Sequence, residues 1–336
     1  MNTERKKVVK NGAMAAFAAA GLMAGCVVDR GLRNGCDPVV GNWVLEIPDD
    51  GGMNASTVQI RRDRDGKATG EMLWRWAEPK PLVSCETSGG KFCIVHPWSM
   101  ILTGEVSGDE MTGLITFVKK DGTADLDNQL PLVAHRSPSI EPTHTSFAKF
   151  GEPIDLLKDG LDGWESMNAK AKFGWSFKDG VLSNKLGTKP DGSWAGGGAN
   201  LKTKRADFYD FNLSYDVRVP KRSNSGVYLR GRYEIQVVDS YGQPTNSLNM
   251  AALYGRITPK VAAEKPAGEW QHVDVTLYRR HLTVVLNGTK IIDNEPVLGA
   301  TGGAFDANEF VPGPIYLQGD HSDADYKNMI LRPVIR

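Results

Sequence analysis

The stretch that decides the fold is FNLSYDVRV at residues 211–219, in which apolar and polar side chains alternate. The stretch HVDVTLY at 272–278 alternates in the same way. A period of two is typical of an antiparallel strand with one buried face. Further strand-like runs are GVYL at 226–229, YEIQVV at 233–238 and HLTVVLNG at 281–288. So many short strands predict an all-β fold, a two-sheet jelly roll or sandwich over residues 147–336.

The residues before this region also have a β pattern. Short runs such as WVLEI at 43–47 and STVQI at 56–60 are separated by turns rich in glycine and aspartate. This spacing predicts a smaller antiparallel β domain over residues 38–136. The stretch SPSIEP at 137–142 has two prolines and no periodicity, so we expect a linker over residues 137–146.

The N-terminal segment has the features of an export signal. Basic residues are followed by a short, alanine-rich apolar stretch over 13–24, which ends in LMAGC at Cys26. This ending resembles a lipobox, which predicts a lipoprotein signal peptide over 1–26, lipidation of Cys26 and a tether over 27–37. By analogy with Gram-negative sorting, Val27 favours the outer membrane, facing the periplasm or cell surface. The alternative is an ordinary cleaved signal with a chance cysteine.

The charge of the chain limits the binding partners that we expect, and its cysteines indicate a possible disulfide. Lys plus Arg and Asp plus Glu both number 40, and no basic stripe indicates nucleic acid. The expected membrane partner is reached through the lipid anchor. Cys85 and Cys93 flank a turn-like TSGG, which makes a disulfide possible in an oxidising compartment. Pairing of either one with Cys36 stays open, because the sequence does not fix connectivity.

The second half of the chain resembles a known family. The matching stretches include DLLKDGLDGW at 155–164, WSFKDGVL at 175–182, NSGVYLRG at 224–231, YEIQVVD at 233–239, GPIYLQGDH at 313–321 and YKNM at 326–329. Together they are similar to the 3-keto-disaccharide hydrolase domains over residues of about 150–336. Two departures are Leu157, where the family usually has Phe, and Ser322, where Gly often follows the histidine. The resemblance implies a concanavalin-like jelly roll that acts on sugars.

The implied substrates are 3-keto-glycosides, whose C3 hydroxyl has been oxidised to a ketone. The ketone acidifies the hydrogen on C2, so the glycosidic oxygen on C1 can leave by β-elimination, and water can then add. Such an enzyme needs a base, an acid and a donor for the enolate oxygen. The chain has no nicotinamide-binding motif. A separate sugar 3-oxidoreductase is therefore expected upstream.

Three residues are the catalytic candidates, namely Glu234, Asp239 and His321. Glu234 and Gln236 share one face of a strand whose other face carries Ile235. The resemblance favours a groove over a solvated outer face for them. Asp239 falls at the strand end, where it is either catalytic or a turn cap. His321 follows a strand in GDHSD, where it serves as a base, binds a possible divalent metal ion, or is a surface-loop residue.

Four residues are the candidates for substrate binding, namely Arg230, Gln236, Tyr254 and Lys265. Arg230 precedes Glu234 in either one bent strand or a hairpin that turns at Gly231. Tyr254 and Lys265 are expected to orient sugar hydroxyls or neutralise the enolate, although Lys265 also fits a plain surface loop.

Two other functions remain open at this point. Jelly rolls often bind sugars without cleaving them, which makes a non-catalytic carbohydrate-binding lipoprotein one alternative. The second alternative is an ordinary glycoside hydrolase, with Glu234 and Asp239 as the two carboxylates that flank the scissile bond.

Overall fold

The computed structural model describes residues 37–47 and 55–335. The chain forms two compact units, divided between Ser139 and Ile140, within the segment predicted as a linker. The predicted signal peptide, Cys26, residues 27–36 of the tether and Cys36 lie outside the described residues. None of the helical segments in the described part is long and apolar enough to cross a membrane.

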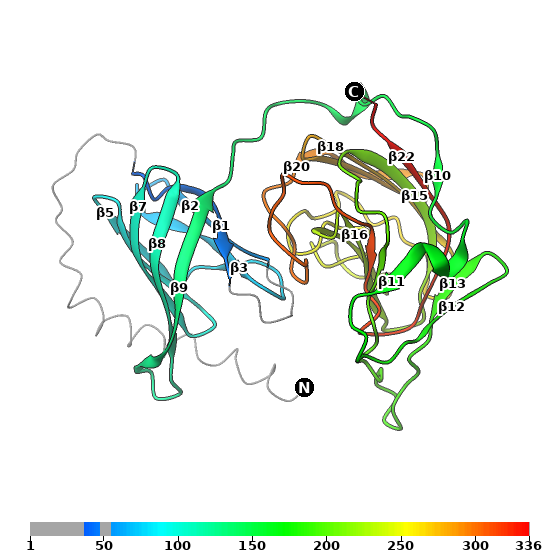
Figure 1. Cartoon of the computed structure of the whole chain (residues 1–336), viewed down its shortest axis with the longest axis horizontal. Coiled ribbons are helices and arrows are strands. Elements are labelled where there is room, and N and C mark those ends of the chain that lie inside the picture. Colours follow the sequence, from blue (N-terminus) through cyan, green and yellow to red (C-terminus); the bar gives the residue numbers. More distant parts are fainter. Residues whose placement is uncertain (1–36, 48–54, 336) are drawn as a thin grey trace. The chain divides into compact units, whose positions relative to one another are not determined.

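The first unit is a nine-stranded antiparallel sheet, in the order β4-β3-β2-β1-β9-β8-β7-β6-β5 (Figure 1). Its strands are β1 (Gly41–Glu46), β2 (Ser56–Arg62), β3 (Ala68–Trp74), β4 (Lys80–Pro81), β5 (Ser84–Ser88), β6 (Lys91–His96), β7 (Met100–Ser107), β8 (Glu110–Val118) and β9 (Ala124–Arg136). The two edge strands, β4 and β5, belong to one continuous segment. Between them the Leu82 N–H donates to Gly70 O and the Val83 N–H to Val95 O. The sheet therefore closes on itself, around a core that includes Trp43, Met72 and Ile94.

The predicted disulfide between Cys85 and Cys93 is wrong. Both residues are buried thiols. Cys85 pairs with Ile94 across β5 and β6, while Cys93 pairs with Glu86. Because neighbouring residues on a strand point to opposite faces, this register places the two sulfur atoms on opposite sides of the sheet.

The second unit consists of two antiparallel sheets. The larger has eight strands, in the order β12-β13-β22-β15-β18-β19-β20 with β10 beside β22, and the smaller has five, in the order β11-β14-β21-β16-β17. The larger sheet contains β10 (Ile154–Asp155), β12 (Trp175–Lys178), β13 (Val181–Asn184), β15 (Phe211–Arg218), β18 (Gln271–Tyr278), β19 (His281–Leu286), β20 (Thr289–Pro296) and β22 (Ala324–Pro333). The smaller contains β11 (Trp164–Ser166), β14 (Leu201–Thr203), β16 (Asn224–Leu229), β17 (Tyr233–Val238) and β21 (Tyr316–Leu317). Two short 3₁₀ turns are η2 (Thr145–Phe147) and η3 (Gly160–Gly163).

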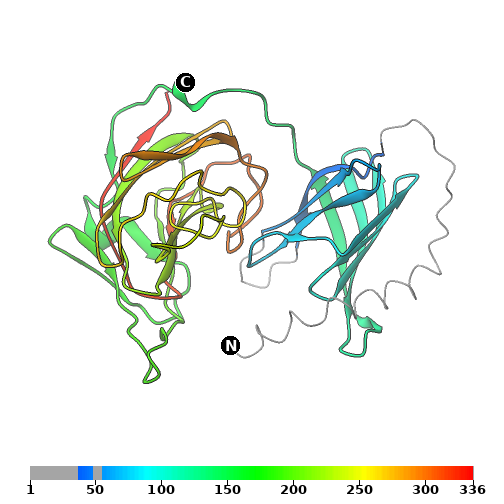
Figure 2. The ribbon, with the colours of Figure 1, turned by 180° about the vertical axis from the view of Figure 1, so that it is seen from behind.

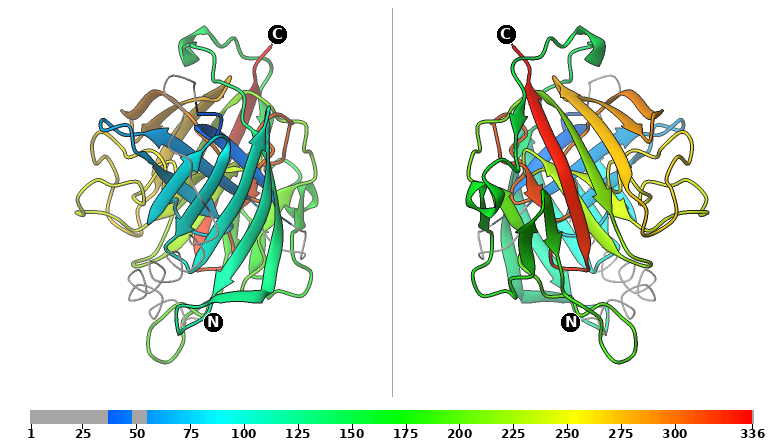
Figure 3. Two further views of the ribbon diagram at one scale, coloured as in Figure 1. Left: turned by 90° about the vertical axis from the view of Figure 1, so that its left-hand side faces the viewer. Right: turned by 90° about the vertical axis from the view of Figure 1, so that its right-hand side faces the viewer.

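The core of this unit lies between its two sheets. In β15, Leu213, Tyr215 and Val217 are fully buried, while the intervening polar residues are partly exposed, as the alternation predicts. The long strand β22 runs beside β15, as the right-hand view of Figure 3 shows. The predicted all-β jelly-roll architecture is confirmed.

An irregular segment covers the outer edge of the smaller sheet. Along β17, the N–H groups of Ala251 and Tyr254 donate to the carbonyls of Gln236 and Glu234. This segment is yellow in Figure 2. This segment therefore supplies backbone partners to Glu234 and Gln236 at what would otherwise be an open sheet edge.

Candidate active site

One face of the five-stranded sheet is polar and carries the candidate site. In β17, Ile235 and Val237 point into the core, so Glu234 and Gln236 leave the sheet on the opposite face. Their cross-strand partners on β16 are Tyr228 and Gly226. The structure thus brings together two of the predicted residues, Glu234 and Gln236.

Glu234 is a deeply buried carboxyl group. Glu234 is only 3% exposed, and its Oε2 lies 2.7 Å from the hydroxyl oxygen of Tyr228. Burial raises the pKa of Glu234 to about 8. A hydrogen bond donated by Tyr228 to the carboxylate would lower this pKa, and the nearby charge of Asp320 raises it. At neutral pH, Glu234 is therefore largely protonated.

The room for this carboxyl comes from Gly226. A Cβ atom at position 226 would lie 2.3 Å from Glu234 Oε1, far inside van der Waals contact. Because glycine has no side chain, it leaves a niche in the sheet surface that the Glu234 side chain fills.

Two stacked tyrosines form the floor beside Glu234. The rings of Tyr228 and Tyr316 lie 4.1 Å apart and nearly parallel. Burial raises the pKa of both phenols well above the usual value. Their hydroxyls lie 2.9 and 3.5 Å from the carbonyl oxygens of Gly302 and Gly303.

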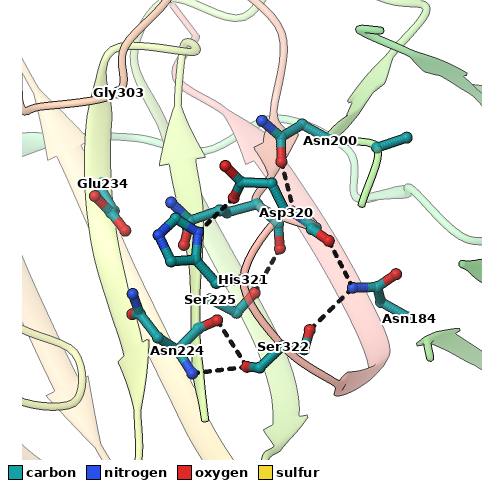
Figure 4. Close-up of polar contacts among 12 residues, drawn as sticks. Asn184, Asn200, Asn224, Ser225, Glu234, Gly303, Asp320, His321 and Ser322 are labelled. Atoms are coloured by element: carbon teal, nitrogen blue, oxygen red, sulfur yellow. Dashed lines mark hydrogen bonds and ion pairs between the residues drawn. The ribbon is translucent and has the colours of Figure 1, made fainter. Parts of the chain in front are cut away.

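Asp320 and His321 form an acid–imidazole pair next to Glu234. His321 Nδ1 lies 2.5 Å from Asp320 Oδ1, and each side chain is about one-third exposed. In Figure 4 the His321 ring is drawn between Glu234 and Asp320. A histidine that donates through Nδ1 to a carboxylate has its Nε2 lone pair directed away from that carboxylate, which suits a base. The structure thus places the predicted residue His321 against Asp320, whose charge is close enough to raise the pKa of Glu234.

The loop that carries Asp320 and His321 is fixed by hydrogen bonds on both sides (Figure 4). The Ser322 hydroxyl accepts from Asn224 N–H at 2.7 Å and donates to Asn224 O at 2.8 Å. The Asn184 amide donates to the Gly319 and Ser322 carbonyls, each at 3.0 Å. Ser322, which departs from the glycine usual in the resembled family, therefore ties the loop to β16.

Arg230 does not belong to this face, so its predicted role in substrate binding is wrong. The chain makes a hairpin turn between β16 and β17, which decides between the two alternatives for this segment. The Arg230 guanidinium is buried, donates to the Tyr233 hydroxyl at 2.8 Å and stacks on Tyr209. Tyr233 belongs to the core cluster, on the side opposite to Glu234.

Asp239 is a turn cap in the structure. Its Oδ2 accepts a hydrogen bond from the Arg222 N–H at 2.9 Å, at the open end of the β16–β17 hairpin. This contact corresponds to the alternative that the sequence left open, and the predicted catalytic role of Asp239 gains no support from it.

Lys265 and Tyr254 differ in their positions. Lys265 is exposed, and its Nζ donates to Trp270 O at 3.1 Å, so it belongs to a surface loop. The Tyr254 backbone N–H donates to Glu234 O at 3.0 Å, and its neighbour Leu253 belongs to the core. The Tyr254 backbone therefore lies beside that of Glu234, and its role in substrate binding stays a prediction.

Within residues 37–47 and 55–335, no group of three or more His, Cys, Asp or Glu side chains could hold a metal ion. The arrangement around Glu234, Asp320 and His321 therefore does not fit the divalent metal that the sequence left possible, and no chemical step is assigned to one.

Sequence reasoning missed Asp320, Tyr228, Tyr316 and Asn200 as members of the site. Asn200 Oδ1 accepts from Gly319 N–H at 2.7 Å and its amide lies 3.3 Å from the Tyr316 hydroxyl. The signal for Tyr228 was its position on β16 two residues after Gly226, because the β16–β17 hairpin places it directly opposite Glu234. For Asn200 no local pattern exists, since its partners lie more than a hundred residues away.

Comparison with known proteins identifies the family. The model of the 3-keto-alpha-glucoside-1,2-lyase-like domain matches residues 153–332. The chain belongs to this family. A search of curated proteins gave no match. The predicted resemblance is thereby confirmed, and family membership makes this a carbohydrate-active protein.

Solved structures with similar folds include two candidate glycosyl hydrolases from Parabacteroides distasonis. One is 23% identical, with 65% of this chain and 99% of that chain covered and a TM-score of 0.42. The other is 22% identical, with 55% and 100% covered and a TM-score of 0.41. The carbohydrate-binding module CBM66 from Bacillus subtilis is 12% identical, with 50% and 93% covered and a TM-score of 0.34.

Proposed function

We propose that this protein cleaves 3-keto-glycosides by removal of the C2 proton, β-elimination of the glycosidic oxygen and hydration of the product. The observation that carries the proposal is a buried Glu234 carboxyl beside a partly exposed His321–Asp320 pair, with burial raising the pKa of Glu234. An elimination needs one group that gives a proton and another that takes one.

His321 is the proposed base. Asp320 accepts the Nδ1–H of the imidazole, which holds the ring and leaves Nε2 to take the C2 proton. The electron pair of the C2–H bond moves to the enolate, with negative charge on the C3 oxygen. The amide of Gln236 is on the same face and supplies a neutral donor, since its Oε1 is already bonded to the Val237 N–H at 3.0 Å.

Glu234 is the proposed acid. Its proton passes to the glycosidic oxygen as the C1–O bond breaks, which forms a C1=C2 double bond conjugated with the C3 ketone. Water then adds at C1 and returns a proton to C2, so the sum of the steps is hydrolysis. The raised pKa of Glu234 keeps its proton available at neutral pH, as an acid requires.

The test is to incubate the purified full chain with trehalose and with 3-keto-trehalose in deuterated water. Cleavage of the keto sugar alone, with deuterium at C2 of the product, is expected. Cleavage of unmodified trehalose would indicate an ordinary glycoside hydrolase. Binding without turnover of either sugar would indicate a carbohydrate-binding protein.

Matched variants assign the roles. Glu234→Gln removes the acid and keeps the side-chain shape, while Asp239→Asn makes the same change at the turn cap. Loss of turnover only in the first is expected. Equal loss in both would contradict the assignment of the acid.

We also propose that the mature chain is exported and anchored through a lipid on Cys26, with a separate sugar 3-oxidoreductase supplying its substrate. Mass spectrometry of the protein extracted from membranes tests the anchor. A Cys26→Ala variant that stays in the membrane fraction, without the mass of a lipid on the wild type, would refute it.

A further inference from the structure

The Tyr228 hydroxyl stands between two acceptors and has a single proton to give. Its oxygen lies 2.7 Å from Glu234 Oε2 and 2.9 Å from the Gly302 carbonyl oxygen. A phenol donates only one hydrogen bond. If the proton goes to Glu234, the charged carboxylate is favoured. If it goes to Gly302, the Tyr228 oxygen must accept from Glu234, and Glu234 must then be protonated.

The Gly302 carbonyl is held in place by its own anchored loop. Next to it, the Thr301 N–H donates to Arg232 O at 2.9 Å, and the Thr301 hydroxyl accepts from Glu234 N–H at 2.9 Å. Arg232 is 2% exposed and binds Asp306 in the same loop. Its Nε lies 2.7 Å from Asp306 Oδ1, and its Nη2 lies 2.8 Å from Asp306 Oδ2. Two parallel charge-assisted bonds of this kind fix geometry as well as energy.

A close packing contact supports the same anchor. The Phe305 ring lies over Gly231, where a Cβ atom would come within 1.6 Å of the ring. The Arg232 guanidinium stacks on the same ring at 4.8 Å. The hairpin turn and residues 301–306 are therefore fastened to each other by backbone, ionic and aromatic contacts.

We propose that the Gly302 carbonyl, positioned by the Arg232–Asp306 ion pair, accepts the hydrogen bond of the Tyr228 hydroxyl and so leaves Glu234 to keep its own proton. Arg232 and Asp306 are then positioning residues that act on Glu234 through Tyr228. The chain of bonds runs from Glu234 to Tyr228 to Gly302, and each bond strengthens the next. The role of Glu234 as an acid rests on the proposed function. The arrangement of protons on Glu234 and Tyr228 does not depend on turnover.

The groups that face Glu234 come from several elements. Tyr228 on β16 and Tyr316 on β21 are phenols that stay neutral, and Tyr326 on β22 is a third. Asp320 carries the negative charge on the facing loop and is bonded to His321. These groups are unchanged by substitutions at Asp306, which is 39% exposed and contacts Arg232. Substitution of Asp306 can act on Glu234 through the loop and Tyr228, or directly through the unpaired charge of buried Arg232, and a double-mutant cycle separates the two routes.

The experiment is a double-mutant cycle read by NMR. Full chains with ¹³C-labelled glutamate carboxyl groups are titrated as wild type, Asp306→Ala, Tyr228→Phe and the double variant, and Glu234→Gln assigns the resonance. In Asp306→Ala the Gly302 carbonyl is less well positioned, so the Tyr228 hydroxyl donates its hydrogen bond to Glu234 instead. The pKa of Glu234 is then expected to fall by about one pH unit, the scale of one hydrogen bond to a charged group.

In the Tyr228→Phe background, Asp306→Ala is expected to cause no further shift, because the hydroxyl that transmits the effect is gone. An equal shift in both backgrounds would show that the unpaired Arg232 charge or water entry, and not Tyr228, is the cause, and would overturn the proposal. No shift in Asp306→Ala would overturn it as well.

Two further variants make the result independent of misfolding. Arg232→Lys keeps the charge but loses the two parallel bonds, and the same downward shift is expected. Asp207→Ala breaks a similar two-bond pair with Arg205, at 3.0 and 2.8 Å on the exposed surface, and no shift is expected. Because the titration requires no substrate, a wild type that fails to cleave 3-keto sugars refutes the proposed function alone.

Discussion

The buried carboxyl of Glu234 makes the stability of the second unit depend on pH. Its pKa is 4.5 when exposed and about 8 in the folded chain. Between these values the unfolded chain has lost the proton and the folded chain keeps it, so the free energy of unfolding falls as pH rises. The loss is about 1.4 kcal/mol per pH unit, and about 5 kcal/mol at most once the pH exceeds 8.

Substitution of Glu234 by Gln removes this dependence, because the amide is neutral at every pH and keeps the side-chain shape. The assay is urea unfolding of the full chain at pH 5, 6.5, 8 and 9. The stability of E234Q relative to wild type is expected to increase from pH 5 to about pH 8 and then to level off. Since the chain folds as two units, the transition that moves belongs to residues 140–336.

The matched control is Glu165→Gln. Glu165 lies on β11 of the same sheet, is about half exposed and pairs with Lys202 at 3.1 Å. Its substitution is expected to leave the pH dependence as in wild type. If the difference between E234Q and wild type were the same at pH 5 and pH 9, Glu234 would not be held protonated, and the reasoning about the acid would fail.

Three more outcomes are expected. His321→Ala should lower kcat for a 3-keto-glycoside by about 10²–10⁴-fold, the usual contribution of a general base, with unfolding unchanged in a parallel urea titration. Gly226→Ala should lower activity by displacing the Glu234 carboxyl, and should destabilise the chain by about 1–3 kcal/mol as an overpacked site does, which activity and urea unfolding would measure together. A reducing agent should leave the stability of the first unit unchanged because Cys85 and Cys93 are thiols, and a fall in its unfolding midpoint with dithiothreitol would contradict this.

Much of the architecture was predictable because β alternation is a local signal. The run at 211–219 gives the buried face of β15 directly, and the alternation of β17 gives the shared face of Glu234 and Gln236. Loops are different, since a sequence does not show which distant segment satisfies their polar groups. Asp320 and Asp239 both follow strands. Only the three-dimensional structure shows that Asp320 binds His321, whereas Asp239 caps the turn at Arg222.

The prediction for Arg230 failed for a related reason. A continuous strand would have placed it in line with Glu234, but the chain turns at residues 230–232, where Arg230 has a positive φ of 54°. The turn sends its guanidinium to the core side, against Tyr233 and Tyr209. Gly231 was the visible cue, because glycine fits a left-handed backbone and close contact with Phe305.

The environments of the two carboxyl groups explain how one sheet face can supply both an acid and a base. Glu234 is buried in the niche opened by Gly226, so its neutral form is favoured. Asp320 is about one-third exposed and bonded to the His321 imidazole. Its charge also raises the pKa of Glu234, so the group that orients the base helps to keep the acid protonated. Replacing Asp320 by Asn should therefore weaken both functions at once, with a lower kcat and a lower pKa of Glu234. A variant that lost activity while the Glu234 resonance titrated as in wild type would separate the two groups and contradict this coupling.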